Sequence, residues 1–426
     1  MKFDKSKNEV ELGDYIDHIK GNAFKSRDMN KNNDVPVIKV KNFTADSIEV
    51  DTSDLLPKSF VVEYERYLLK ENDILISTVG SWPSNPESVV GKVVRVPNLK
   101  KKLLLNQNIV KVFSTSQYLD NSFLFWVLKS ENFKQFIISK AQGSANQASI
   151  TLKSIDTYTF ELPSIEEQRE ISEFLNNIQN KIELNNQMIA TLEELTATLF
   201  KRWFVDFEFP DENGNPYKSS GGKMVDSELG EIPEGWEVNS IFDRCIITGG
   251  GTPKTDIFDY WDGKIPFYTP KDAKNFLFVN DTEKHISLSG LNNSSTRLYK
   301  SGTIFITARG TVGKINIAAK DMAMNQSCYA ITNKNGNQYF IYNVLSRQVK
   351  LIKASSNGAV FNAITTRDFK LYKFSIPKND ELINLFEDRV NSFYEKCRNL
   401  ILENDNLREM RDYLLPKFLS GDILLK

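Results

Sequence analysis

The sequence predicts an α+β protein in which two mixed lobes of short strands and helices are joined by two long helices, paired antiparallel as a coiled coil. Three observations predict this fold class. Two heptad stripes occupy residues 163–204 and 377–426, and the segments ahead of them repeat one plan in the same order. Because a long apolar stripe must be covered, each stripe is a natural partner for the other.

The first stripe has apolar side chains at alternating steps of four and three. Its members are Ile171, Leu175, Ile178, Ile182, Ile189, Leu192, Leu199 and Trp203, with Asn185 and Thr196 at the two remaining positions. Pro163 and Ser164 supply a breaker and an N-cap, and no later Pro or Gly interrupts the stripe. The pattern therefore predicts a helix of about 40 residues that would reach about 60 Å.

The second stripe has the same rhythm. Its members are Phe386, Val390, Phe393, Cys397, Leu400, Leu407, Leu414 and Phe418, with Asn404 and Arg411 at polar positions. Each helix packing only on its own globular domain is the alternative. Both stripes are narrow and long and follow similar segments, which favours mutual pairing. Asn185 and Asn404 then fix the register at some loss of stability, unless they face water at a frayed end.

The internal repeat is the main result from the sequence. TYTFELP (157–163) matches LYKFSIP (371–377), and NDILIST (72–78) matches GTIFITA (302–308). The polar loop 143–149 likewise matches the loop 355–362. The offset drifts only through loop-sized insertions, so a lobe and a long helix occur twice. The predicted parts are a first lobe, a central helix, a linker, a second lobe and a C-terminal helix: residues 1–162, 163–204, 205–235, 236–376 and 377–426.

Composition is that of an ordinary soluble chain of 426 residues, with 40% hydrophobic and 26% charged residues. No apolar run approaches the roughly 18 residues of a membrane span, and the start lacks a signal-peptide core. The three cysteines, Cys245, Cys328 and Cys397, lie far apart without histidine nearby. We expect them to be buried small apolar residues in a reducing cytoplasm.

Charge is distributed unevenly although the net charge is −1. The first lobe has a net charge of +2 and the second +8, whereas the central helix, linker and C-terminal helix have −3, −6 and −2. This distribution is expected if the lobes alone meet a polyanion. Within the linker, residues 206–224 have the Gly, Pro, Ser and charge bias of a flexible connector, and the segment ELGEIPEGWEV after them opens the second lobe.

The sequence contains no persuasive set of catalytic residues. The two histidines lack a nucleophile or metal partner, and neither a phosphate loop nor a methyl-donor motif is present. Asp211 with Asp262 and Lys264 only loosely mimics a nuclease set, because Asp211 sits in the predicted linker. The sequence predicts a protein that binds rather than reacts, with no cofactor or metal.

Several segments together resemble the specificity subunit of Type I restriction–modification systems. They are SIEEQREISEFL, LEELTATLFKRWF, LGEIPEGWEV, LLPKFLSGDI and, in the second lobe, GGGTP and YWDGKIPFYTPKD. The resemblance covers nearly the whole chain. It implies that each lobe is a target-recognition domain that reads one half of a bipartite duplex DNA sequence. The helices would space the halves and dock two methyltransferase subunits, with restriction subunits completing the complex.

The first lobe departs from the second, and this implies different half-sites. It lacks the GGGTP and YW elements, and SWPSNPES (81–88) interrupts the loop that reads RGTVG in the second lobe. A duplex read at two places on one face needs readers about 34–36 Å apart, which a helical rod sets better than a flexible linker.

Candidate DNA-binding residues of the second lobe lie in loops beside glycine or after a strand: Thr252, Lys254, Thr269, Lys271, Arg309 and Lys314. Arg309 leads as a base or phosphate reader, against the alternative of a solvated turn residue. Asn325 and Gln326 could read adenine. Because the first lobe repeats the pair as Asn106 and Gln107, a structural role is favoured.

The corresponding candidates in the first lobe are Lys39, Lys41, Ser77, Thr78 and Lys92. The run from Lys100 to Lys102 more often forms a solvated face, and Trp82 more often packs locally than stacks on DNA. Near the ends of the central helix, the candidates for holding partner subunits are Arg169, Arg202, Trp203 and Phe204. Trp203 has core packing as its alternative.

Two other classes stay open. A protein–protein scaffold that binds no DNA fits the near-zero net charge, and salt-sensitive duplex binding separates it from a DNA reader. A nuclease is disfavoured, because no segment is left over for a catalytic domain.

Overall fold

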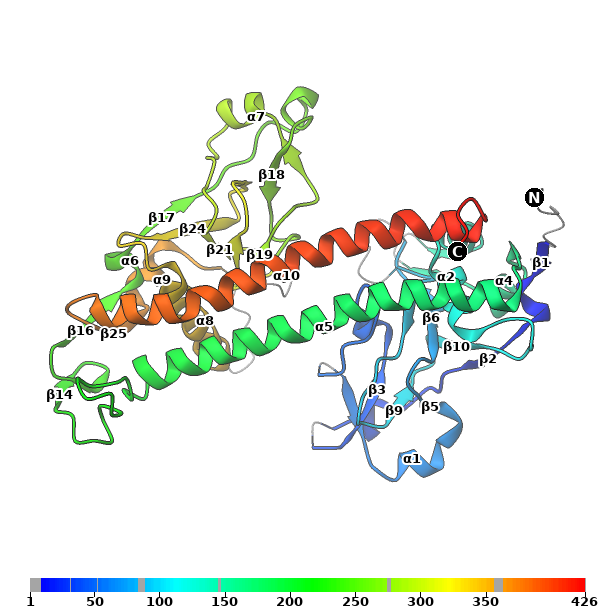
Figure 1. The fold of residues 1–426 in the computed structure, drawn as a ribbon, viewed down its shortest axis with the longest axis horizontal. Helices are drawn as coiled ribbons and strands as arrows, with labels where there is room; N and C mark the ends of the chain where they lie inside the picture. The colour runs from blue at the N-terminus through cyan, green and yellow to red at the C-terminus, as the bar shows by residue number, and fades with distance from the viewer. Residues whose placement is uncertain are drawn as a thin grey trace. The chain divides into compact units, whose positions relative to one another are not determined.

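The structure, a computed structural model, describes residues 9–30, 32–51, 53–82, 89–144, 147–273, 277–355 and 363–425. It divides into two compact units. The first comprises Met1–Asn180 and Leu407–Lys426, and the second comprises Lys181–Asn406. Each unit therefore contains one lobe together with a part of both long helices (Figure 1).

The first unit is built on two four-stranded sheets. One has the order β2 (Ile16–Lys20), β10 (Ile109–Ser114), β6 (Ile74–Ser77), β8 (Val93–Arg95) and is antiparallel. The other has the order β4 (Asp54–Leu56), β3 (Val35–Ile38), β9 (Leu103–Leu105), β5 (Leu68–Leu69), with β3 and β9 parallel. All four residues of β6 are buried, as expected for an apolar strand covered on both faces.

Two helices follow β10 and carry much of this unit's core. In α2 (Asn121–Lys129) six consecutive side chains from Phe123 to Leu128 are buried, and Asp120 caps the helix by accepting from the Ser122 and Phe123 amides. The other helix is α3 (Glu131–Ser139). The shorter elements are β1 (Glu9–Glu11), β7 (Val79–Gly80), β11 (Gln142–Ser144), β12 (Gln147–Ser149), β13 (Thr159–Glu161), α1 (Phe60–Glu63) and α4 (Leu152–Asp156).

The second unit repeats this plan. Its larger sheet has the order β17 (Cys245–Gly249), β24 (Cys328–Asn333), β21 (Ile304–Thr307), β22 (Ile315–Ala318), β19 (Phe278–Val279). Its smaller sheet has the order β20 (His285–Ile286), β18 (Ile265–Tyr268), β23 (Ala323–Met324), with β18 and β23 parallel like β3 and β9. The helices of this lobe are α6 (Ile241–Arg244), α7 (Leu288–Asn292), α8 (Gln338–Ser355) and α9 (Thr366–Leu371).

Each lobe opens and closes with strands that pair with one another. β1 pairs antiparallel with β13, and β16 (Trp236–Ser240) pairs antiparallel with β25 (Lys373–Pro377). A long helix follows each closing strand. The predicted repeat of a lobe and a helix is thus confirmed at the level of strand pairing, and β19 is an edge strand that has no counterpart in the described part of the first unit.

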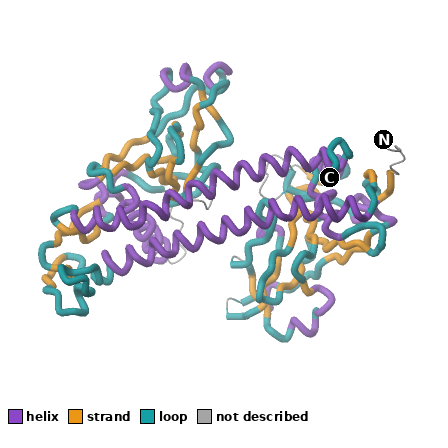
Figure 2. The backbone as a smooth tube through the Cα atoms, viewed as in Figure 1, coloured by secondary structure: helices purple, strands orange, loops and turns teal. Residues whose placement is uncertain are grey.

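The two long helices are α5 (Ile165–Phe204) and α10 (Glu381–Leu419), drawn as continuous helical tubes in Figure 2. Most residues of the predicted stripes are buried: Ile171, Leu175, Ile178, Ile182, Asn185, Ile189, Thr196 and Trp203, and Phe386, Val390, Cys397, Leu400, Asn404, Arg411 and Phe418. The predicted helices are confirmed.

Pairing of the helices is antiparallel in both units. In the first unit the Phe174 and Phe418 rings lie 5.6 Å apart. In the second, Asn185 Nδ2 donates to Asn404 Oδ1 at 2.9 Å. Each helix also packs on its own lobe, because Ile171 of α5 belongs to the core of the first unit and Phe386 of α10 to the core of the second. Mutual pairing and lobe packing therefore coexist.

Residues 206–224, predicted to be a flexible connector, instead pack on the core of the second unit. Phe207 and Phe209 are buried, with ring centroids 5.4 and 5.3 Å from that of Trp236. A hairpin of β14 (Met224–Ser227) and β15 (Gly230–Pro233) follows. The Gly, Pro, Ser and charge bias obscured these aromatic residues, which anchor the segment to the core of the second unit.

The three cysteines are buried and free, as the sequence predicted. Burial raises the pKa of each thiol to about 12. Over the residues that the structure describes, no helix is long and apolar enough to cross a membrane.

The Asn185–Asn404 pair makes a prediction about register and stability. Asn185 also donates to Glu403 Oε2 at 2.9 Å, and Asn404 donates to Asn186 Oδ1 at 2.9 Å. Asn404→Leu removes partners of a buried amide and should lower the free energy of unfolding by about 1–3 kcal/mol. Changing both Asn185 and Asn404 to Leu should recover most of that loss, because no fully buried amide is then left without its partner. Urea denaturation of the three variants measures this, and strictly additive effects would contradict the pairing.

Candidate nucleic-acid interface

Arg309 lies at an exposed turn between β21 and β22 that is shaped by two glycines and one hydroxyl. Gly310 and Gly313 have φ values of 78° and 74°, in the left-handed region that favours glycine. Below them, the buried Thr307 accepts from the Lys314 amide at 2.9 Å and donates to the Thr311 carbonyl. The turn is therefore held from inside, and Arg309 is exposed.

The glycine loop after β17 packs against a second turn. A Cβ on Gly250 would lie 2.2 Å from the Asn325 carbonyl oxygen, so only glycine allows this approach. The Gly251 amide donates to the Met324 carbonyl at 3.1 Å, and the Thr252 hydroxyl bonds to the Gln326 side chain. The GGGTP motif and the Asn-Gln pair, about 75 residues apart in sequence, thus meet, and Lys254 is exposed beside them.

A third turn follows β18 and joins the same edge. Thr269 donates through its amide and its hydroxyl to Asp272 Oδ2 at 2.9 and 2.7 Å, so it caps its own turn. The Asn325 amide donates to the Tyr268 carbonyl at 3.0 Å, and a Cβ on Gly310 would come within 3.9 Å of Pro270. These contacts bring the three turns to one end of the second lobe, and Lys271 is exposed there.

The first lobe has the same internal frame. Ser77 occupies the position of Thr307: its hydroxyl accepts from the Lys92 amide at 3.0 Å and donates to the Val89 carbonyl at 2.9 Å. A Cβ on Gly21 would lie 2.0 Å from the Asn106 carbonyl oxygen, as Gly250 does from Asn325. The repeat therefore extends to individual hydrogen bonds.

Ser77 and Thr78, predicted to bind DNA, lie inside the first lobe. They are 0% and 5% exposed, because both faces of β6 are covered. Their place corrects the expectation of a surface position and leaves them a role in holding the turn. The favoured structural interpretation of Asn106 and Asn325 agrees with their matching backbone bonds to Ile38 and Tyr268.

The lysines of the first lobe are partly engaged with their own lobe. Lys39 and Lys41 contact Asp54 Oδ2 at 2.7 and 3.3 Å, and hydrogen bonding from Lys39 lowers the pKa of that carboxyl. The Lys92 ammonium donates to the Phe43 carbonyl at 3.3 Å. Trp82 donates its indole N–H to the Ser144 carbonyl at 2.8 Å, which is local packing; residues 83–88 of its loop lie outside the described residues.

The predicted partner-binding residues separate into two kinds. Arg169 and Arg202 are exposed on α5. Trp203 and Phe204 are each 4% exposed, with ring centroids 6.1 and 5.3 Å from that of Phe386. Contrary to the expectation, these two rings belong to the core of the second unit, which was the alternative for Trp203.

Two hollows, which sequence reasoning missed, occupy equivalent places in the two units. The first, of about 410 Å³, is lined by Glu71, Asn72, Arg95, Asn121, Ser122, Asn176 and Asn180. The second, of about 750 Å³, is lined by residues that include Ser301, Gly302, Gln338, Tyr339 and Asn391. Asn72 and Gly302 both have positive φ, at 66° and 87°, and precede the equivalent strands β6 and β21. Asn176 and Asn391 lie at matching turns of α5 and α10.

The loose nuclease set does not assemble a described metal site. Asp211 Oδ1 accepts from the amides of Asn213 and Asn215 at 2.9 and 2.8 Å, which is a turn within its own segment. No group of three or more His, Cys, Asp or Glu side chains among the described residues is placed to hold a metal ion.

Comparisons with known proteins agree with this architecture. The family model described as Type I restriction modification DNA specificity domain matches residues 5–194 and 233–386. The HindI specificity subunit of Haemophilus influenzae is 26% identical over 410 residues, covering 83% of this chain and 87% of its own. The putative MjaX specificity subunit of Methanocaldococcus jannaschii is 24% identical, covering 98% and 93%.

A solved structure shares the fold. The Type I restriction–modification S subunit from M. genitalium has a TM-score of 0.54 at 16% sequence identity, with 98% of each chain covered. The family model matches most of the chain, in two segments that coincide with the two repeats. The chain therefore belongs to the Type I restriction modification DNA specificity domain family.

Proposed function

We propose that this chain is the non-catalytic, cytoplasmic DNA-specificity subunit of a Type I restriction–modification complex, in which each lobe reads one half of a bipartite duplex target. The observation that carries the proposal is the pair of family domains on one hydrogen-bonded frame, with different side chains exposed at the equivalent loops. Two lobes with the same backbone frame can each contact one half of a duplex target. Because their exposed side chains differ, the two half-sites should differ in sequence.

In the second lobe we assign DNA contact to the edge formed by the three turns. Lys254, Lys271 and Arg309 are exposed there, on a lobe of net charge +8. Thr252 and Lys314 would support this edge, and Thr269 acts through its turn. Arg309 has the planar, five-donor guanidinium that pairs bidentately with guanine or phosphate.

In the first lobe the proposed contacts are Lys39, Lys41 and Lys92. Lys39 and Lys41 share Asp54 as an ion-pair partner, and the net charge of the lobe is only +2. The first lobe therefore attracts DNA phosphates less strongly than the second lobe does. We expect the first half-site to depend more on geometry and hydrogen bonding, and the second more on phosphate attraction.

The partners that we propose are two methyltransferase subunits, joined by restriction subunits in the full complex. Two copies of one partner need two equivalent docking places, and the hollows beside Asn176 and Asn391 are such a pair. The runner-up function is a scaffold without sequence-specific DNA binding, which the net charge of −1 favours.

Methylated-base mapping tests the central proposal. We expect co-expression with the cognate methyltransferase subunit to methylate a split motif of two short half-sites around a fixed spacer. Replacing residues 236–376 with those of a relative should change one half only, because the other lobe is untouched. Assembly without any split methylation motif would favour the scaffold instead.

Arg309→Ala tests the edge of the second lobe. If Arg309 contacts a phosphate, the slope of log affinity against log salt should become shallower by about 0.9, uniformly across sequences. If it reads a base, discrimination at one position should relax by about tenfold to a hundredfold. Lys373→Ala is the matched control: it removes another exposed cation of the second lobe, one that pairs with Glu228 rather than lying on the three turns, and should leave the salt slope unchanged. If the Arg309→Ala complex keeps the parental salt slope and the parental base discrimination, Arg309 does not contact DNA and is a solvated turn residue.

Two arginine substitutions test the hollows as partner sites. Asn391→Arg and Asn180→Arg each place a long cation at an exposed helix position that lines one hollow. Each should reduce the bound methyltransferase subunits from two to one, as measured by native mass spectrometry. Ser392→Arg is the control, because the next helix position is rotated by about 100°. Two bound subunits in both test variants would contradict this docking.

A further inference from the structure

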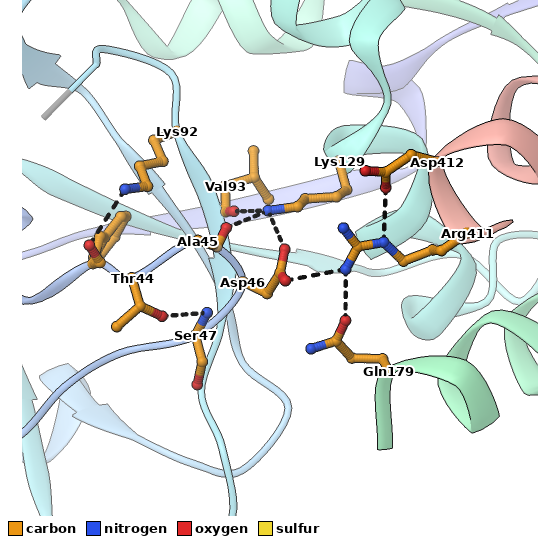
Figure 3. A network of polar contacts seen from close by, with 11 residues as sticks. Thr44, Ala45, Asp46, Ser47, Lys92, Val93, Lys129, Gln179, Arg411 and Asp412 are labelled. Carbon is orange, nitrogen blue, oxygen red and sulfur yellow. Dashed lines mark hydrogen bonds and ion pairs between the residues drawn. The ribbon is translucent and has the colours of Figure 1, made fainter. Parts of the chain in front are cut away.

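Arg411 of α10 enters a network of buried charges in the first unit (Figure 3). Its side chain is only 7% exposed, and its Nη1 lies 3.0 Å from Asp46 Oδ2. The same nitrogen donates to Gln179 Oε1 of α5 at 2.7 Å, and Nε donates to Asp412 at 2.8 Å. Arg411 thus joins both long helices to the Asp46 loop of the lobe.

Asp46 is fixed from a second direction by Lys129. The Lys129 ammonium lies 2.9 Å from Asp46 Oδ1 and also donates to the carbonyls of Ala45 and Val93 at 2.6 and 3.3 Å. Burial by itself would raise the pKa of Asp46, but Lys129 and Arg411 outweigh it and lower the pKa to about 2. The carboxylate is therefore ionised and paired on both oxygens.

The loop that contains Asp46 continues directly from proposed DNA contacts. Lys39 is the N-cap of the short 3-10 helix Val40–Asn42, which contains Lys41, and Asn42 Nδ2 donates to the Glu49 carbonyl at 3.1 Å. The Lys92 ammonium holds the Phe43 carbonyl in the same loop. Residues 39–49 are thus one tethered segment, with proposed DNA contacts at one end and the Arg411 network at the other.

We propose that Arg411 is a positioning residue for the first half-site: the C-terminal helix, through Arg411 and Asp46, sets the place of the segment 39–49 that meets DNA. This inference rests on the proposed function. Arg411 would not touch DNA itself, since it is buried between α5, α10 and the lobe.

A purely stabilising role is the weaker explanation for such a network. Burying charge is costly, and apolar side chains of similar size in such places are often as stable or more stable. The planar guanidinium of Arg411, however, presents its N–H donors in a fixed geometry and can therefore hold the loop in one position. The matching position of the first repeat, 215 residues earlier, is Thr196, which has no charge. The helix position equivalent to Arg411 therefore carries no charge in the first repeat.

The test uses the complex of the full chain with its methyltransferase subunit, on duplexes in which one or the other half-site is altered. Arg411→Met keeps the apolar stem and leaves Asp46 paired with Lys129, so the fold has no orphan carboxylate. We expect discrimination at the first half-site to fall about tenfold to a hundredfold, the range of a lost hydrogen bond to a charged group. Discrimination at the second half-site should be unchanged, and Arg411→Lys should retain part of the selectivity.

Arg398→Met is the matched control. Arg398 is also on α10, but its Nη2 donates to the Ala319 carbonyl of the second lobe at 2.7 Å. Arg398→Met should leave discrimination at the first half-site equal to that of the parent. Amide hydrogen exchange supplies a readout independent of DNA: residues 39–49 should exchange faster in Arg411→Met and not in Arg398→Met.

Equal loss at both half-sites, or unchanged exchange in residues 39–49, would overturn the inference. The inference would also be overturned if Arg411→Met recognised the same split target as the parent with unchanged discrimination. The proposed function would then still stand. A parent complex that reads no split sequence would instead remove the proposed function and this inference with it.

Discussion

The structure depends on covering the apolar stripes of α5 and α10. A helix of about 40 residues with a continuous apolar face is not stable alone in water, so each needs a partner along its length. The helices meet this need by pairing with one another and by closing the lobes. Leu415 and Phe418, close to the C-terminus, lie in the core of the first unit, and Ile189 and Phe200 of α5 lie in the core of the second. Each lobe is therefore completed by the helix that follows the other repeat.

This exchange of helices explains which expectations the sequence supported well. Periodicity and repeats are properties of many residues at once, so the stripes of α5 and α10 and the matching lobes were predictable without any contact being known. The polar positions Asn185, Asn404 and Arg411 were also identified, because they interrupt an otherwise regular pattern. Their partners were not, since Asp46 and Gln179 come close only after both helices have packed on the lobe.

Predictions of a surface role for single residues failed where packing from elsewhere in the fold buries the residue. Ser77 and Thr78 are polar and lie at a strand end, yet both are buried inside the first lobe. Trp203 and Phe204 lie near a helix end, yet the second lobe folds over them. The segment 206–224 has a linker composition, but three aromatic contacts fix it. In each case tertiary packing, rather than local preference, decided the outcome.

The repeat also shows how one backbone can serve two readings of DNA. Gly21 and Gly250 approach equivalent carbonyls, and Ser77 and Thr307 hold equivalent turns, so these buried contacts are matched in the two lobes. The exposed positions on this frame differ: a short cationic turn with Arg309 in one lobe, and in the other lysines tied to Asp54 and a loop tied to Arg411. Because the buried bonds set the loop positions, an exposed side chain at the edge can change without moving the frame. That separation lets two half-sites be specified independently by a chain whose core is built twice in one way.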